Sequence, residues 1–466
     1  MKINRDSNKP LNLFALVMIN IIAVDSLRTL PIGADYGYSL IFYYVLAALV
    51  FFIPVSLVAA ELATAMPETG GLYIWVKEAF GRRAGFITIW LQWIYNVVWY
   101  PTIMVFIVST LAYLLDPSLG QNKGYVLPVS IGLFWIATLL NCLGMRVSSV
   151  VSIIGAIVGT IIPMLLLIFL AVIWVAQGKP LALTFEWHSL LPDWHHSNEL
   201  VMLGGILFGL IGMEMSAVHA GDVRNPQRDY PKALLFSTII IFFTLLMGSL
   251  AIAIIVPKDN LDIVTGLMSA FTRFIPGIDR SWLLPAVVIM IFTGAISSVS
   301  TWLMGPARGL MVSAKDACLP SILARVNQYG APVSLLIFQA ILFTVLCGVY
   351  ILFDEISLSY WLLSDLTAQL ALLVYVFMFA AAIYLRIQKP DMLRPFRIPG
   401  GNWVCYLVAG IGMLTCLLVI GTGFIPPQAL MFSQKIYYEI FLLTGLFFFF
   451  ALPWWLARKH TLSHKQ

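Results

Sequence analysis

The sequence predicts an all-α protein that crosses a membrane twelve times. Of its 466 residues, 61% are apolar and only 11% carry a formal charge, whereas soluble domains usually have ~25% charged residues. At ~20 apolar residues per crossing, this is enough hydrophobic sequence for about a dozen spans. Strands of a membrane barrel would be ~10-residue segments of alternating polarity, and the apolar runs here are longer and uniformly hydrophobic. The composition therefore excludes both a water-soluble protein and a membrane barrel.

Reading the chain for runs long enough to span a bilayer gives twelve candidates. The predicted spans are 11–31, 39–63, 85–115, 125–144, 150–176, 199–219, 233–256, 282–304, 333–353, 360–386, 403–425 and 436–457. They leave tails at 1–10 and 458–466 and connecting loops too short to hold a soluble domain.

The basic residues predict the orientation of the bundle. Twenty of the 27 Lys and Arg residues lie in the two tails and in the loops that follow even-numbered spans, six lie in the other loops, and Arg28 lies inside a span. Because cytoplasmic loops carry the excess of positive charge, both termini are predicted to be cytoplasmic. We expect a multi-pass membrane protein.

The first span contains an acid and a base at mid-membrane depth, where each costs about 2.5–3.5 kcal/mol on insertion scales. Asp25 and Arg28 flank Ser26 and are three residues apart, so on a continuous helix they would share a face. One interpretation is a local ion pair that cancels their cost. The other is that they face a wet cavity and meet a charged substrate or a proton. The sequence leaves both open.

The sixth span is rich in glycine and then acidic. Gly204, Gly205, Gly209 and Gly212 fall within nine residues and precede Glu214. Glycine weakens a helix and lets backbone approach a ligand, although it also serves tight packing between membrane helices. The pattern predicts an interrupted helix with a buried carboxylate beside the interruption.

The span spacing predicts two five-span repeats, 11–176 and 199–386, followed by two further spans within 403–457. An odd number of spans per repeat inverts the second copy, and the two interrupted spans open the two halves. Transporters built in this way bind substrate near the bilayer midplane, between discontinuous helices at matching positions. Exposed peptide groups at such breaks attract ions and can bind the carboxylate of an amino acid.

Several motifs resemble those of amino acid–polyamine–organocation transporters. These are Glu61-Leu62-Ala63-Thr64, Thr69 to Val76, Phe208 to Ala233 with its Asn225 to Pro231 loop, Trp302 to Gly309, and Phe396-Arg397-Ile398-Pro399-Gly400-Gly401. The last two look like the bacterial glutamate/γ-aminobutyrate antiporter branch, which implies a location in the bacterial inner membrane. The resemblance covers nearly the whole chain and implies a LeuT-type fold, with a five-plus-five inverted repeat, discontinuous helices 1 and 6, and two extra helices.

The resemblance also implies roles for particular residues. Phe208 would be the aromatic gate over the substrate, Trp302 would stack on the substrate, and Glu214 would take part in gating and the pH response. Packing alone is the alternative for both aromatic residues. One departure matters, because many members break the first span with a glycine–serine run, whereas 23–29 contains no glycine. Side-chain recognition by Asp25 and Arg28 could replace part of the backbone recognition there.

Together these observations predict a secondary active transporter that works by alternating access. The expected substrate-binding residues are Asp25, Ser26, Arg28, Asn96, Gly205, Phe208, Gly209 and Trp302, and the expected gating or proton-coupling residues are Asp25, Phe208 and Glu214. The main interpretation is exchange of a glutamate-like amino acid for a decarboxylated, GABA-like amine. A proton-coupled symporter of another amino acid or a polyamine is the alternative, and a membrane-embedded enzyme is remote because no metal-spaced cluster of acids or histidines occurs. We expect no cofactor, metal or nucleic acid, and either a monomer or a homodimer.

Overall fold

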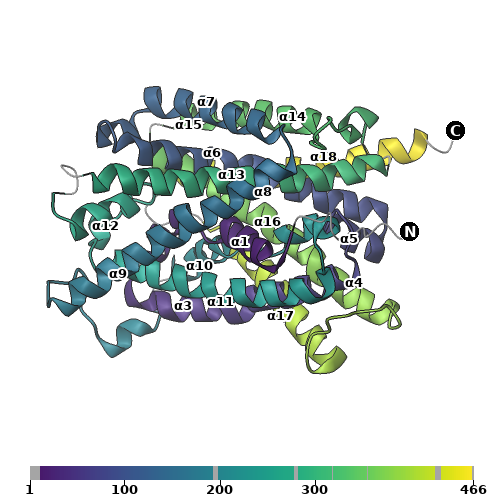
Figure 1. Cartoon of the computed structure of the whole chain (residues 1–466), viewed down its shortest axis with the longest axis horizontal. Helices are drawn as coiled ribbons and strands as arrows, with labels where there is room; N and C mark the ends of the chain where they lie inside the picture. Colours follow the sequence, from purple (N-terminus) through teal and green to yellow (C-terminus); the bar gives the residue numbers. More distant parts are fainter. Residues whose placement is uncertain are drawn as a thin grey trace, which may run out of the picture.

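The computed structural model is a bundle of long helices that lie side by side, with α1 in its middle (Figure 1). It describes residues 11–192, 198–277, 282–316, 319–353, 355–425 and 432–463. Within these residues the backbone forms helices and turns, with one isolated bridge between Leu11 and Val223 as its strand-like pairing. The predicted all-α class is confirmed.

Eleven helical segments of the described chain are long and apolar enough to cross a membrane. They are Leu13–Ala34, Gly37–Ala65, α6 (Arg82–Ala112), α7 (Lys123–Asn141), Val150–Ala176, α11 (Pro226–Ala253), α13 (Leu283–Lys315), Val333–Leu352, α16 (Ile356–Gln388), α17 (Gly401–Thr422) and Lys435–Trp455. Each corresponds to a predicted span, and most ends agree within a few residues. The remaining predicted span, 199–219, coincides with two shorter helical pieces.

Some of these segments are composite. The second contains α3 (Leu40–Ala47), a π-helical stretch (Ala48–Phe52) and α4 (Ile53–Ala65). The fifth contains the end of α8 (Met145–Ile154), a π-helical stretch (Gly155–Ile161) and α9 (Ile162–Ala176). The eighth contains α14 (Val333–Leu346) and α15 (Val349–Leu352), and the last lies within α18 (Phe432–Ser463). Two shorter helices, α5 (Leu72–Phe80) and α12 (Gly266–Phe274), lie in the connections.

Helix α13 is longer than the predicted span 282–304, because it continues to Lys315 through Pro306. A proline inside a helix cannot donate to the carbonyl four residues earlier. That carbonyl belongs to Trp302, and the hydroxyl of Tyr100 donates to it at 3.1 Å. The helix therefore passes the proline without leaving this buried carbonyl unpaired. The predicted span is shorter because the apolar run ends near the first charged residue.

The first span is interrupted as predicted. Helix α1 (Leu13–Val24) ends before Asp25, which is extended (φ −74°, ψ 95°). A 3-10 turn (Leu27–Thr29) and α2 (Leu30–Ala34) then continue the span. The side chain of Thr29 donates to the carbonyl of Ser26 at 2.8 Å and steadies the break. The interruption thus forms without glycine.

The sixth span is interrupted as well. Helix α10 (Asn198–Gly209) ends at the third of the four glycines, and a 3-10 helix (Met215–Asp222) follows after five residues. Within the gap Gly212 has φ +124°, a conformation that other residues rarely adopt. Gly204 and Gly205 are helical, so Gly212 is the glycine that the break requires.

The predicted domain limits remain predictions. Helix α18 continues to Ser463, so the tail expected from 458 begins as helix, while 1–10 and 464–466 lie outside the described residues. At the centre, α6 packs along both α13 and α16. The broken spans lie against this group, since α1 contacts α13 and α10 contacts α16.

Candidate functional site

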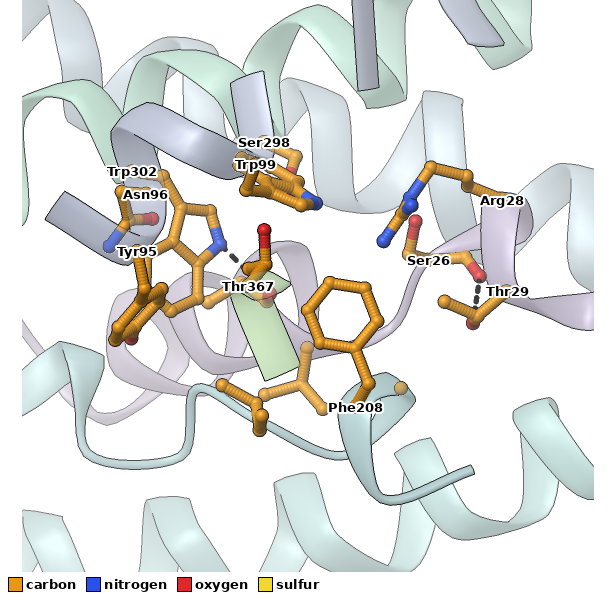
Figure 2. Close-up of a pocket in the computed structure, with 14 residues that line it drawn as sticks. Ser26, Arg28, Thr29, Tyr95, Asn96, Trp99, Phe208, Ser298, Trp302 and Thr367 are labelled. Carbon is orange, nitrogen blue, oxygen red and sulfur yellow. Dashed lines mark hydrogen bonds between the residues drawn. The ribbon is translucent and has the colours of Figure 1, made fainter. Parts of the chain in front are cut away.

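A central cavity lies where the two breaks meet, and it contains about 400 Å³ of space not occupied by protein atoms. Its walls come from both broken spans and from α6, α13 and α16 (Figure 2). The lining residues are Ala23, Val24, Ser26, Arg28, Thr29, Tyr95, Asn96, Trp99, Phe208, Gly209, Ile211, Ser298, Trp302 and Thr367.

Arg28 brings a positive charge to this cavity. Its side chain is buried, and its Nη1 donates to the hydroxyl of Tyr360 at 2.9 Å and to that of Thr102 at 3.4 Å. The Cζ atom lies 5.1 Å from the centre of the Phe208 ring and 5.9 Å from that of Trp99, within the range of cation–π contacts. Among the described residues, its Nε has no hydrogen-bond partner. In the described part of the chain, no carboxylate forms an ion pair with Arg28.

Asp25 faces a different neighbour, so the local ion pair is not formed. Its Oδ2 accepts a hydrogen bond of 2.8 Å from Thr244 of α11, and its Oδ1 has no hydrogen-bond partner in the described structure. The ion-pair interpretation is therefore wrong, because it assumed a continuous helix. The chain is extended at Asp25 and Ser26, and the two charged side chains leave the break towards different spans.

Trp302 forms an aromatic wall of the cavity and supports the first break. Its indole Nε1 donates to the carbonyl of Ala23 at 3.0 Å, which satisfies an acceptor exposed near the end of α1. Its ring centre lies 6.0 Å from those of both Tyr95 and Trp99. Phe208 projects from α10 beside the Arg28 guanidinium (Figure 2). Both rings line the cavity and also pack against the hydrophobic core, so their roles in stacking and gating remain predictions.

Glu214 is buried but does not line the cavity. Its carboxylate accepts hydrogen bonds from the hydroxyl of Tyr375 and from Nε2 of Gln92, the latter at 3.3 Å. The same Tyr375 hydroxyl accepts a hydrogen bond of 2.9 Å from the backbone N–H of Gly212. The acid is thus coupled to the second break through one tyrosine.

The other predicted substrate residues divide into two groups. Ser26, Asn96 and Gly209 line the cavity, and the side-chain amide of Asn96 donates to the carbonyl of Gln92 at 2.6 Å. Gly205 does not line it, since a Cβ atom there would meet Ile32 of α2 at 2.9 Å. Its expected role in binding has no support from this geometry.

Sequence reasoning missed the partners of the predicted charges. Tyr360 and Thr102 hold Arg28, Thr244 holds Asp25, and Tyr375 and Gln92 hold Glu214. A usable signal existed only in the third span. There Gln92, Tyr95, Asn96, Trp99 and Thr102 recur every three or four residues and so mark one polar and aromatic helix face.

A second cavity adjoins the first and shares Ser26 and Ser298 with it. It contains about 240 Å³ of space between the first break, α6, the π-helical stretch of the fifth span and α13. Asp25 is the charged residue in its lining. The remaining lining residues are Ser26, Leu27, Phe106, Gly159, Thr160, Ile291, Gly294, Ala295 and Ser298.

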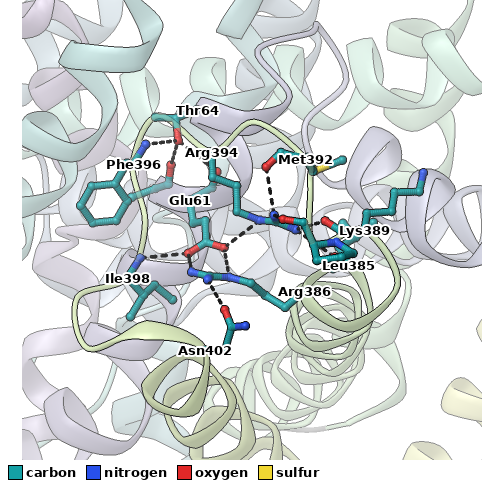
Figure 3. A network of polar contacts seen from close by, with 12 residues as sticks. Glu61, Thr64, Leu385, Arg386, Lys389, Met392, Arg394, Phe396, Ile398 and Asn402 are labelled. Carbon is teal, nitrogen blue, oxygen red and sulfur yellow. Dashed lines mark hydrogen bonds and ion pairs between the residues drawn. The ribbon is translucent and has the colours of Figure 1, made fainter.

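Other buried charges lie at one end of the bundle, in what we term the Glu61 cluster: Glu61, Arg386 and Arg394 (Figure 3). Arg386 forms two hydrogen bonds to the Glu61 carboxylate, at 2.6 and 2.5 Å. The backbone N–H of Ile398 also donates to Glu61, at 2.9 Å. Two of the motifs that support the family resemblance, 61–64 and 396–401, therefore meet here, and the cluster joins α4 to α16 and the loop before α17.

A helical membrane bundle with two interrupted spans around a small polar cavity is the architecture of a secondary transporter. Comparison with known proteins identifies the family. The family model for amino acid permeases matches residues 9–447, and the chain belongs to this family. The predicted superfamily is thereby confirmed, and the chain is a transporter of amino acids or related amines and not an enzyme.

Three relatives illustrate the range of this family. An uncharacterized transporter of Legionella pneumophila is 55% identical, covering 97% of this chain and 98% of its own. The glutamate/gamma-aminobutyrate antiporter of Lactococcus lactis is 28% identical, covering 97% and 91%. A probable agmatine/putrescine antiporter of the same species is 24% identical, covering 90% and 88%.

Proposed function

We propose that this protein exchanges an acidic amino acid, glutamate or a close analogue, for its decarboxylated amine, γ-aminobutyrate (GABA) or a close analogue, by alternating access. The observation that carries the proposal is Arg28, a buried guanidinium beside the central cavity with no carboxylate partner in the described chain. Guanidinium binds carboxylate through charge-assisted hydrogen bonds. A buried guanidinium without an acidic partner is unfavourable, and the carboxylate of a substrate would supply that partner.

The same residue argues against a polyamine as substrate. Agmatine and putrescine, which name one relative, carry positive charge at both ends. A fixed cation in the cavity would repel such a molecule, whereas glutamate and GABA each bring a carboxylate. The Lactococcus relative named for these two substrates supports the same choice.

A proton-coupled symporter is the second candidate, and two buried acids favour it. Asp25 and Glu214 are each hydrogen-bonded by neutral side chains and form no ion pair with a described cation. Such an acid is a candidate proton carrier in a membrane protein. For the exchanger and the symporter alike, we propose the bacterial cytoplasmic membrane with both termini inside, on the strength of the basic-residue bias.

Flux measurements in proteoliposomes separate the candidates. Vesicles preloaded with GABA should take up labelled glutamate rapidly, and vesicles without internal amino acid should take up almost none, with or without an imposed proton gradient. Uptake into empty vesicles that follows the proton gradient would instead establish symport.

Arg28 provides the matched variants for this assay. Arg28→Ala should reduce the uptake of acidic substrates more than that of neutral ones, and Arg28→Lys should restore only part of it, because lysine lacks the planar fork of arginine. Equal loss for acidic and neutral substrates would reject the role of Arg28 in reading a carboxylate.

A further inference from the structure

The second cavity has the properties of a cation site. Asp25 lies in its lining with only 2% of its surface exposed, and one carboxylate oxygen has no hydrogen-bond partner. Three residues with hydroxyl groups, Ser26, Thr160 and Ser298, belong to the same lining. A buried carboxylate without a cation is costly, so this arrangement favours a positively charged guest.

Thr244 determines which oxygen is available to that guest. Its hydroxyl donates to Oδ2 of Asp25 at 2.8 Å and leaves Oδ1 unpaired. Within the described chain, no Lys, Arg or His forms an ion pair with Asp25. A cation that pairs with Asp25 would therefore be supplied by a bound ligand and not by the described chain.

The two cavities are lined by side chains of opposite charge and share two lining residues. Arg28 lies in the larger one and Asp25 in the smaller one, and Ser26 and Ser298 belong to both. Three residues of chain reach at most about 11 Å, so the Cα atoms of Asp25 and Arg28 are no farther apart than that. One small molecule with a carboxylate and an ammonium group suits this pair of charges.

We propose that Asp25 binds the ammonium group of the transported amino acid while Arg28 binds a carboxylate of the same molecule, so that the carrier reads the spacing between the two groups. This inference rests on the proposed exchange function and deepens it. Glutamate and GABA share one unit, a carboxylate joined through three carbons to an ammonium group. Decarboxylation removes the other carboxylate of glutamate and leaves that unit intact.

Recognition of the shared unit explains how one site accepts both exchange partners. The group that differs, the α-carboxylate, is attached to the carbon that bears the ammonium group. It would therefore lie near the junction of the two cavities, where the lining offers the hydroxyls of Ser26 and Ser298. Neither partner then needs a separate binding mode.

The test measures binding to the purified, detergent-solubilised full-length protein, so that it does not depend on turnover. The ligands are GABA, butyrate, which lacks the ammonium group, and the shorter and longer analogues β-alanine and 5-aminopentanoate. Wild type should bind GABA at least tenfold more tightly than butyrate and more tightly than either length analogue. Asp25→Asn should weaken GABA binding by about 10- to 100-fold, as expected for a charge-assisted hydrogen bond, and leave butyrate binding nearly unchanged.

Thr244→Val is the matched control. It removes the hydrogen bond to Oδ2 but keeps the carboxylate and its free Oδ1, so the preference for GABA over butyrate should persist. Butyrate binding also reports whether each variant retains a folded cavity. If Asp25→Asn lost butyrate and GABA equally, Asp25 would support the cavity as a whole, and its assignment to the ammonium group would be overturned.

Two other outcomes would also overturn the proposal. An unchanged preference of Asp25→Asn for GABA would place the ammonium group elsewhere. Binding of GABA and butyrate that depends equally on sodium, and loses that dependence in Asp25→Asn, would assign the cavity to a free alkali cation. Failure of the exchange function is a separate result, because it appears as wild-type vesicles that do not exchange glutamate for GABA.

Discussion

The Glu61 cluster and the two cavities both bury charged side chains inside the bundle, but they treat them differently. In the cluster, Glu61 receives hydrogen bonds from Arg386 and from the Ile398 backbone, and Arg394 donates to carbonyls at the end of α16. In the cavities, Asp25 and Arg28 are equally buried, yet each keeps a polar atom without a partner.

This contrast separates structural charges from functional ones. A buried ion pair with its remaining bonds satisfied holds neighbouring helices together, whereas a buried charge left open lowers stability. A protein keeps such a charge when function requires it, as in the usual trade between stability and activity. Buried charged groups that line a cavity and keep an unpaired atom, Asp25 and Arg28, therefore mark the candidate substrate site.

The largest expected effect comes from breaking the saturated cluster. Arg386→Met leaves Glu61 buried without its main partner, which should destabilise the protein by about 3–5 kcal/mol. The loss would appear as a lower melting temperature in detergent and a smaller folded fraction on size-exclusion chromatography. Adding Glu61→Gln should recover part of the loss, because the lone carboxylate is then neutral. A single variant as stable as wild type would show that the cluster is not a structural support.

The corresponding change in the cavity should weaken substrate binding without lowering stability. Arg28→Met removes a charge that has no acidic partner in the described chain, so its melting temperature should equal or exceed that of wild type. Binding of glutamate should nevertheless weaken by roughly 10- to 100-fold, the value of a charge-assisted hydrogen bond. Melting curves and binding isotherms on the same preparation check both parts. Unfolding as severe as that of Arg386→Met would erase the distinction between the two regions.

The fold and the identity of the buried charged residues can be predicted from the sequence, whereas the contacts of these residues cannot. Long apolar runs determine the spans, and Asp25 and Arg28 mark the first break although it contains no glycine. Their partners are distant in the chain, because Tyr360 lies 332 residues from Arg28 and Arg386 lies 325 residues from Glu61. Periodicity within one span cannot report such contacts, and the local ion pair was inferred from helix geometry that the break removes.

Glu214 lies between the two extremes, since it has hydrogen bonds but no ion pair with a described cation. Tyr375→Phe would remove one bond to this carboxylate and the acceptor of the Gly212 N–H. Leaving these buried groups unsatisfied should cost about 1–3 kcal/mol and slow transport. Tyr350→Phe is the matched control, because the buried Tyr350 hydroxyl has no hydrogen-bond partner among the described residues and its removal should be neutral or stabilising. Equal melting temperatures for both variants would argue against this network.

The smallest effect is expected from a charge pair outside the membrane-spanning segments. Lys77 of α5 forms an ion pair with Asp316, which also accepts a 2.6 Å hydrogen bond from Tyr73. Partial burial acts to raise the pKa of Asp316, but the hydrogen bonds from Lys77 and Tyr73 and the charge of Lys77 outweigh it and lower the pKa. Because both side chains are about one-third exposed, with 34% and 29% of their surfaces accessible, Lys77→Ala should cost less than about 1 kcal/mol.

The lowered pKa gives this contribution a defined pH dependence. Asp316 is more acidic in the folded than in the unfolded protein, so its contribution is complete above the ordinary value of 3.8 and is lost as the pH falls through the folded value. Wild type and Lys77→Ala should therefore differ slightly in melting temperature at neutral pH and converge in strong acid. A difference that grew as the pH fell would contradict the sign of the shift.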